Sequence, residues 1–244
     1  MAQGGSLSRD NFGYSMPIDA PLFPRPPIYY RNVETIRVAF LTDEEAVAAM
    51  IPADLTVASP AVATASVITY HFSTLGTYNE FMIILGVQRD GQDAYYIPHI
   101  MVDNDQALAA GREIWGYPKK LAHITLERQG QAMIGTVERP VGNRLCTVTV
   151  QPETPVEQPP PAAPGLSLRV IPGLGENGAP ELAQLIETRT ISQVHGAWSG
   201  PAGLSFGVVS TIDPLSRLPI RQIIGGTYVL SDMILPLGRV VKQY

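Results

Sequence analysis

The sequence predicts an α+β protein dominated by antiparallel sheet. Most of its apolar segments are short, and they either alternate with polar residues or are rich in β-branched and aromatic residues, as strands are. Turns that contain Gly, Pro or Asp-Gly separate these segments, and only two segments have the composition of helices. Strands do not alternate with long helices and no internal repeat is present, so a parallel α/β sheet is not indicated.

The N-terminal residues 1–20 predict a flexible arm, followed by a single domain over residues 21–244. The stretch 21–27, Pro-Leu-Phe-Pro-Arg-Pro-Pro, is too proline-rich for a helix or a central strand. Residues 1–15 contain no apolar segment of the kind that secretory signals have, and no apolar run approaches transmembrane length. The sequence thus favours a protein that is neither exported nor inserted in a membrane.

The first half of the domain is predicted to be strands with two short helices. Thr42-Asp43-Glu44-Glu45 has the form of a capping box and predicts a helix that runs through Met50 and stops at Pro52. A second helix is predicted to open at Asp103 or Asn104 and to end near Gly116. Strands are predicted over 34–41, 61–72, 81–88 and 94–102, with a hairpin turn at Asp90-Gly91 between the last two.

The second half is predicted to contain strands alone. The proline-rich stretch 151–165 predicts an irregular surface loop within the domain. Around Glu181 the pattern is ambiguous between helix and strand, and the alternation from Leu185 favours a strand. Strands are predicted over 122–128, 132–138, 143–151, 166–171, 185–195, 204–209 and 227–235.

Composition and charge exclude several classes of function. A net charge of −5 over 244 residues provides no basic surface for nucleic acid or for an anionic membrane. The single cysteine, Cys146, cannot form an internal disulfide, so the expected compartment is the cytoplasm. Charged residues make up only 16% of the chain, which favours contacts between subunits.

Motifs for common cofactors are also missing from the sequence. The four histidines have no short mutual spacing and only one cysteine could join them, so we expect no metal site. The Gly-rich turns are not followed by Lys-Ser or Lys-Thr, so we expect no nucleotide cofactor. No serine stands in a Gly-x-Ser-x-Gly motif, which argues against a serine nucleophile.

Two of the three lysines in the chain, Lys119 and Lys120, are adjacent. A lysine, unlike an arginine, becomes a neutral nucleophile near neutral pH when apolar surroundings or a neighbouring cation lower its pKa. Trp115 and Tyr117 would supply the apolar surroundings, and Lys120 would be the neighbouring cation. On the dipeptide alone, an exposed loop edge is the commoner interpretation.

The surrounding motifs resemble those of the acetoacetate decarboxylase family. The active-site segment of that family is matched by Asp103-Asn104, Ala107, Gly111-Arg112-Glu113 and Tyr117-Pro118-Lys119-Lys120-Leu121. The resemblance extends in order from about residue 21 to 241, through Phe23-Pro24-Arg25, Leu75-Gly76 with Tyr78 and Glu80, His195 with Ala197-Trp198, and Ile234-Leu235-Pro236.

The resemblance implies a site and a fold. It implies that Lys119 is a Schiff-base lysine that needs no cofactor and that Glu80 is the catalytic glutamate. Lys120 would tune the amine, and Tyr117, Trp115 and Tyr78 would line the substrate pocket. The implied fold is a closed, cone-like antiparallel β-barrel with flanking strands and few short helices, its site in the barrel cavity. Homo-oligomers are expected.

Two positions depart from the decarboxylases of the family. By direct count Val33 stands where they carry an arginine, and Ala65 where they carry a second acidic residue. The sequence therefore predicts a cofactor-independent lyase that acts on a small oxo acid through Lys119, such as a decarboxylase of acetoacetate or another β-keto acid. The alternatives are a pyruvate aldolase-dehydratase or a hydratase of a 2-oxo-enoic acid that uses the same lysine. A non-catalytic protein that binds a small ligand is the minor alternative.

Overall fold

The computed structural model describes residues 4–157, 163–176 and 178–244, which form one twelve-stranded and one four-stranded sheet. The larger sheet has the order β10 (Thr154–Pro155), β13 (Ile191–Gly200), β15 (Gln222–Leu235), β1 (Ile28–Leu41), β3 (Val62–Ser73), β4 (Tyr78–Arg89), β5 (Gln92–Val102), β11 (Gly165–Pro172), β12 (Pro180–Thr188) and β16 (Arg239–Gln243). Two further strands branch from this path, β2 (Thr56–Val57) on β4 and β6 (Lys119–Leu121) on β5. The smaller sheet has the order β14 (Ala202–Phe206), β9 (Arg144–Val150), β8 (Ala132–Glu138) and β7 (His123–Gln129).

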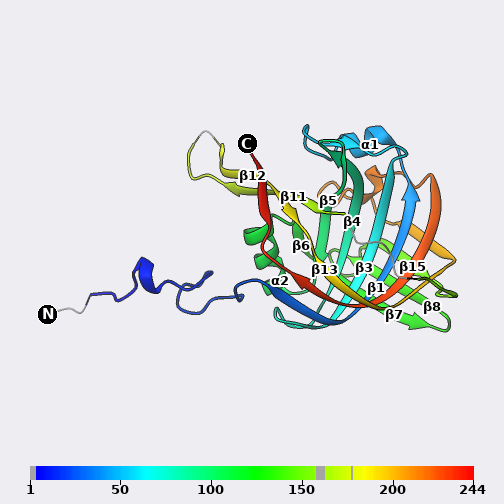
Figure 1. Ribbon diagram of the computed structural model, residues 1–244, viewed down its shortest axis with the longest axis horizontal. Coiled ribbons are helices and arrows are strands. Elements are labelled where there is room, and N and C mark those ends of the chain that lie inside the picture. Colours follow the sequence, from blue (N-terminus) through cyan, green and yellow to red (C-terminus); the bar gives the residue numbers. More distant parts are fainter. Residues whose placement is uncertain (1–3, 158–162, 177) are drawn as a thin grey trace.

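The long strands of the larger sheet curve strongly (Figure 1). The closed barrel that the resemblance implied is not confirmed, because the larger sheet ends at β10 and β16 and neither sheet of the described chain closes on itself. The edge strand β10 contributes only two residues, and Pro155 has no backbone N–H to offer another strand. The mainly antiparallel pairing is confirmed, with parallel pairing where β5 meets β6 and β11.

The two faces of the larger sheet have different surroundings because side chains alternate along each strand. On one face Ile36 of β1, Val67 of β3 and Phe81 of β4 belong to the main hydrophobic core, together with buried side chains of β8 and β9. Gly135 of β8 permits this close approach of the two sheets, since a Cβ there would lie 2.7 Å from a Val67 methyl group. The opposite face of β1, β3 and β4 is free to line a cavity.

The predicted helices are present but differ in detail. The first, α1 (Glu44–Ala48), begins after Asp43 with no side-chain cap. The predicted capping box is wrong, because the hydroxyl of Thr42 is buried and accepts no hydrogen bond from the helix. The second, α2 (Asp105–Ala110), is capped by Asn104, whose side chain accepts a 2.8 Å hydrogen bond from the backbone N–H of Ala107.

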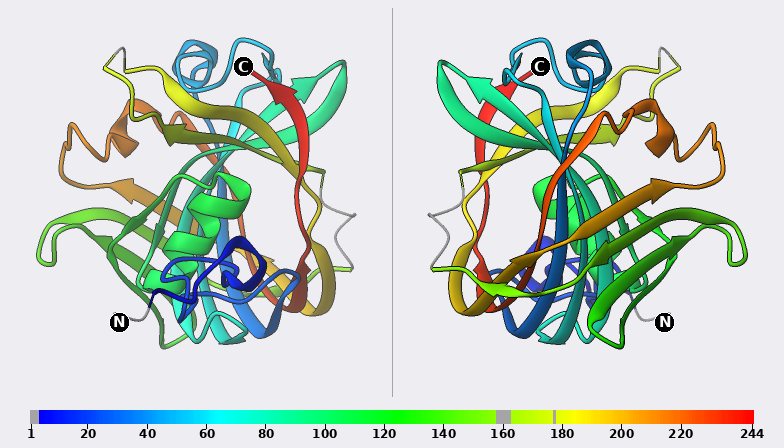
Figure 2. Two further views of the ribbon diagram at one scale, coloured as in Figure 1. Left: turned by 90° about the vertical axis from the view of Figure 1, so that its left-hand side faces the viewer. Right: turned by 90° about the vertical axis from the view of Figure 1, so that its right-hand side faces the viewer.

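Figure 2 shows α2 beside the larger sheet, where it continues into a π-helical turn, η2 (Gly111–Trp115). Two short 3-10 helices complete the helical elements of the described chain, η1 (Arg9–Asn11) and η3 (Leu215–Arg217). The N-terminal segment that carries η1 extends away from the sheets (Figure 1). None of the helices in the described ranges has the length and apolar content needed to span a bilayer.

The single strand predicted over 185–195 is wrong, because two strands meet there. β12 ends at Thr188, and β13 begins at Ile191. The alternation runs through both, but they pair with different partners: β12 with β11 and β16, β13 with β15 and β10. The predicted loop over 151–165 contains β10 and the first residue of β11, and its residues 158–162 lie outside the described chain. The other predicted strands are confirmed, although β1 begins six residues and β15 five residues before the predicted start.

We predict that His99 of β5 makes stability depend on pH between about 6.5 and 4. Burial, reinforced by the nearby Lys120 ammonium, lowers the pKa of His99 to about 4. The unfolded chain therefore binds a proton at His99 at a higher pH than the folded chain, and stability falls as the pH falls through this window. In urea titrations at pH 7 and 5, His99→Gln should lose about 1–2 kcal/mol less unfolding free energy than the wild type. Equal losses in both proteins would contradict the assignment.

Candidate active site

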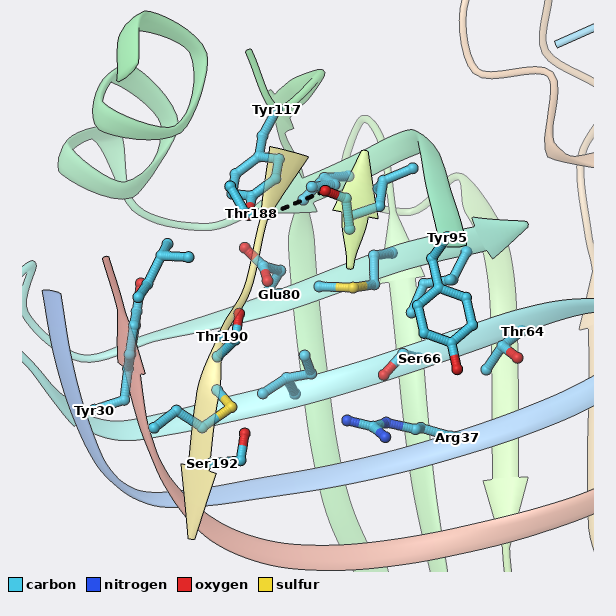
Figure 3. A pocket seen from close by; sticks show the side chains of 18 of the residues that line it. Tyr30, Arg37, Thr64, Ser66, Glu80, Tyr95, Tyr117, Thr188, Thr190 and Ser192 are labelled. Carbon is cyan, nitrogen blue, oxygen red and sulfur yellow. Dashed lines mark hydrogen bonds between the residues drawn. The ribbon is translucent and has the colours of Figure 1, made fainter. Parts of the chain in front are cut away.

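A cavity of about 290 Å³ lies on the face of the larger sheet that is turned away from the main core. Its walls come from alternate residues of β1, β3, β4 and β5, together with Tyr117 and Lys119. The curvature of the sheet brings Thr188, Thr190 and Ser192 across from β3 and β4 (Figure 3). The cavity is lined by both apolar and polar side chains, and its size is near the lower end for small-molecule sites.

The cavity contains a lysine and a glutamate in direct contact. Nζ of Lys119 lies 2.7 Å from Oε2 of Glu80, and the two side chains are only 6% and 5% exposed. Strand pairing explains the contact, because β4 and β6 flank β5 on opposite sides and place both residues at the same end of it. A buried ammonium–carboxylate contact is one proton transfer away from a neutral amine and a neutral carboxylic acid.

The helical segment before Lys119 shapes the space that its side chain occupies. A Cβ on Gly111 would lie 2.6 Å from Cδ and 2.7 Å from Cε of Lys119, so only glycine leaves room for the lysine stem. Gly116 ends η2 with a left-handed φ of 71°, and a Cβ there would lie 2.4 Å from the backbone of Arg169. These two glycines fix where β6 begins and how Lys119 enters the cavity.

Tyrosines surround the lysine–glutamate contact. The hydroxyl of Tyr70 donates a 2.9 Å hydrogen bond to Oε1 of Glu80, the oxygen that does not face Lys119. The ring centroids of Tyr78 and Tyr70 are 4.4 Å apart. Nζ of Lys119 lies 5.6 Å from the ring centroid of Tyr78. Burial raises the pKa of Tyr70 and of Tyr78 well above the usual range. Both phenols are therefore neutral, and the Tyr70 hydroxyl is a proton donor to Glu80.

Tyr117 forms another part of the wall. Nζ of Lys119 lies 5.9 Å from the centroid of its ring, and its hydroxyl makes a 3.0 Å hydrogen bond with Oγ1 of Thr188. Burial raises the pKa of Tyr117 to about 12. Trp115 stacks on Tyr117 at 6.1 Å and donates a hydrogen bond to the Pro236 carbonyl. In the described chain Trp115 is not among the cavity-lining residues and supports the wall from behind.

Lys120 points away from the cavity, because adjacent residues of β6 face opposite sides. Its ammonium contacts the carbonyl of Ile212 and lies 2.9 Å from Oδ1 of Asp213. Asp213 is 1% exposed and also lies 3.1 Å from Nε of Arg139. The charge of Lys120 is thus balanced by a buried carboxylate on the far side of the strand.

The two departures found in the sequence lie outside the cavity. Val33 is buried in a hydrophobic cluster with Phe23 and Tyr30, and Ala65 faces the main core. Sequence reasoning also missed three residues that line the cavity. Arg37 is charged, Tyr70 donates a hydrogen bond to Glu80, and Tyr30 packs against Tyr70. Arg37 had a usable signal, since it is a charged residue inside the apolar alternation of a predicted strand.

The fold encloses a cavity of small-molecule size in which an amine and a carboxylate are in contact. No arrangement of three or more metal-ligating side chains occurs among the described residues. The family described as acetoacetate decarboxylase (ADC) matches residues 15–244, and the chain belongs to this family.

Individual relatives agree with this assignment. Acetoacetate decarboxylase of Streptomyces nogalater is 32% identical over 235 residues, which cover 94% of this chain and 95% of the relative. The crystal structure of acetoacetate decarboxylase from Legionella pneumophila has a TM-score of 0.88 at 27% identity and covers 100% of this chain and 99% of its own. The enduracididine biosynthesis enzyme MppR in complex with pyruvate shares the fold, with a TM-score of 0.83 at 21% identity over 95% of this chain and 98% of its own.

We predict that Gly111→Ala destabilises the protein by about 1–3 kcal/mol, because the added methyl overlaps the Lys119 stem. The sign is informative: the φ of Gly111 is −59°, and glycine to alanine at a helical φ normally stabilises. Urea denaturation measures the change. Gly225→Ala is the matched control, because a Cβ at that position would have nothing within 4 Å, and we expect a change of no more than about 0.5 kcal/mol. A stabilised Gly111 variant would show that the stem does not pack there.

Proposed function

We propose that this protein is a lyase that binds a small oxo acid as a Schiff base on Lys119 and decarboxylates a β-keto acid. The observation that carries the proposal is the 2.7 Å contact between Nζ of Lys119 and Oε2 of Glu80, buried in a cavity of small-molecule size. Membership of the acetoacetate decarboxylase family supports the reaction class.

The first half of the proposed reaction forms the iminium. Glu80 takes a proton from the Lys119 ammonium, and the neutral amine attacks the ketone carbon of the substrate. The carbinolamine loses its hydroxyl group as water, with the proton returned from Glu80. The resulting iminium is flanked by the rings of Tyr78 and Tyr117, whose faces lie 5.6 and 5.9 Å from the lysine nitrogen and stabilise a cation there.

The second half breaks the carbon–carbon bond and releases the product. The electrons of the bond to the carboxylate move toward the iminium nitrogen, carbon dioxide leaves, and an enamine remains. Glu80, which gave its proton to the departing water, takes up one proton from solvent and adds it to the enamine carbon. Water then hydrolyses the imine to free the ketone and Lys119. The hydrogen bond from Tyr70 to Glu80 orients the carboxyl group for both transfers. The iminium nitrogen is the electron sink, so these steps require no cofactor.

A second candidate uses the same amine on a different substrate. The enamine of pyruvate would add to an aldehyde and the product would lose water, or a 2-oxo-enoic acid would be hydrated. The observation that favours this candidate is that Val33 and Ala65, which stand where the decarboxylases carry an arginine and a second acidic residue, are packed in hydrophobic clusters. Borohydride trapping separates the two candidates.

We predict that borohydride reduction in the presence of acetoacetate leaves an isopropyl group on Lys119, with acetone released in the absence of borohydride. Mass spectrometry after proteolysis maps the adduct, and Lys119→Ala should give none. Lys242→Met is the matched control, because Lys242 pairs with Asp54 and lies outside the cavity lining, and it should leave trapping unchanged. A carboxyethyl adduct from pyruvate, with no adduct from acetoacetate, would replace decarboxylation by the aldolase or hydratase reaction. No adduct from either substrate would contradict the Schiff base.

We predict that Glu80→Gln lowers kcat for the trapped substrate by about 10²- to 10⁴-fold, because the amide cannot exchange the proton with Lys119. Steady-state kinetics measures the loss, and the adduct should still form on Lys119 with long exposure. Tyr70→Phe, which removes only the hydrogen bond to Glu80, should have a smaller effect. Wild-type turnover in Glu80→Gln would exclude Glu80 as the proton carrier. In Lys120→Met we expect the pH profile of trapping to stay close to wild type, because Asp213 balances this charge.

A further inference from the structure

The cavity contains a second charged group, separate from Lys119 and Glu80. Arg37 of β1 points into it, on the side of the cavity that Ser66 and Tyr95 also line (Figure 3). In the same view Glu80 lies closer to Tyr117 and Thr188 than to this group.

Arg37 has no counter-charge among the described residues. No carboxylate of that part of the chain forms an ion pair with it, and its side chain donates no hydrogen bond to another described residue. The groups that act on it electrostatically are the phenols of Tyr70 and Tyr95, while loss of contact with bulk water inside the cavity lowers its pKa. An arginine keeps its proton even so. Arg37 is exposed and lines the cavity, so its unpaired guanidinium is available to an anion that enters the cavity from outside the chain.

Strand register gives the distance between the two ends of the cavity. Arg37 is directly opposite Ser66, whereas Glu80 is directly opposite Ile68 on the other side of β3. Ser66 and Ile68 are two residues apart, so the two ends are offset by roughly 6.6–6.8 Å along the strands. β1 and β4 flank β3, so the two ends are also separated by roughly 9.4–9.8 Å across the sheet. The side chains between them, Ile68 and Met82, are apolar. The cavity thus has the amine at one end, the guanidinium at the other, and apolar side chains between them.

This spacing decides which carboxylate Arg37 can hold. The carboxylate lost from a β-keto acid is attached to the carbon next to the iminium, and therefore stays close to Lys119. Arg37 lies at the other end of the cavity, where it can bind a second carboxylate that stays in the product. A guanidinium binds a carboxylate with two parallel hydrogen bonds. The Tyr95 hydroxyl, on the same side of the cavity, can donate to the same oxygens.

We propose that Arg37 is the specificity-determining residue of this site and that the substrate is a 3-oxo dicarboxylic acid whose second carboxylate binds to Arg37. The substrate class rests on the proposed function, since Lys119 is the other anchor. The anion site itself rests on Arg37 alone. The two parts are tested by separate measurements.

The first test measures binding without chemistry. Isothermal titration calorimetry compares hexanedioate with hexanoate, which has the same chain length and one charge fewer. Wild-type protein should bind hexanedioate about 10- to 100-fold more tightly, as expected for charge-assisted hydrogen bonds to a guanidinium. Arg37→Met should lose this preference, and Arg37→Lys should recover part of it, because lysine restores the charge without the planar fork.

The matched control for binding is Arg31→Met. Arg31 is on the same strand, but its side chain is 46% exposed and lies 3.5 Å from Asp232, so the variant changes the net charge equally without touching the cavity. It should keep the wild-type preference. A wild type that binds both acids equally, or a preference that survives in Arg37→Met, would overturn the anion site.

The second test measures turnover of 3-oxohexanedioate and 3-oxohexanoate by carbon dioxide release, with Lys119 trapped by borohydride in parallel. Wild type should prefer the dianion in kcat/KM by about 10- to 100-fold, and Arg37→Met should remove the preference mainly through KM. Equal kcat/KM for the two acids, with the Lys119 adduct present, would overturn the substrate class alone. A hexanedioate preference in calorimetry with no Lys119 adduct from either acid would overturn the proposed function and the substrate class, and leave the anion site standing.

Discussion

The contact between Lys119 and Glu80 is the interaction on which the rest of the site depends. Both side chains are almost fully buried, and each is the nearest oppositely charged partner of the other. Holding them together requires β4 and β6 on the two sides of β5, a helix that stops at Gly116, and a glycine at position 111 where the lysine stem passes. Several residues of the motif around the lysine pair are thus needed for the backbone path and for the space that the Lys119 side chain occupies.

The same strands that build the core also build the cavity. β1, β3 and β4 place Ile36, Val67 and Phe81 between the two sheets, and the residues next to them along the chain face the opposite way into the cavity. This arrangement explains how a curved, open sheet can enclose a site without closing into a barrel. The enclosure comes from curvature and from β12 and β13 on the far wall, where Thr188 and Ser192 line the cavity.

Much of the fold was predictable because strand periodicity is a local property. The strands around residues 34–41 and 81–88 and the helix capped by Asn104 were found in this way. Alternation also indicated two faces for each strand, but it does not say which face meets another sheet and which meets a cavity, because that depends on contacts distant in sequence. The break at residues 189–190 was missed for the same reason, since the alternation continues through it while the pairing partners change.

For the site, the resemblance supplied Lys119 and Glu80, and counting along the family pattern directed attention to Val33 and Ala65. Neither of those positions lines the cavity, and the charge at Arg37 is four residues further along the same strand than Val33. Val33 and Arg37 lie on the same face of β1 and differ in their place along the strand, whereas Ala65 faces the main core. Lys120 also points away from the cavity, since its place beside Lys119 in the sequence puts it on the other side of β6, against Asp213.

The two-faced sheet has a consequence for how such a protein can evolve. Changes at Thr64, Ser66 or Arg37 alter side chains that surround empty space and leave the packing between the sheets untouched. Along the same strands, one set of alternate residues maintains the packed core, and the other set can change the substrate that the cavity accepts. A lineage can exchange one oxo acid for another along one row of side chains, while the neighbouring row continues to fold the chain.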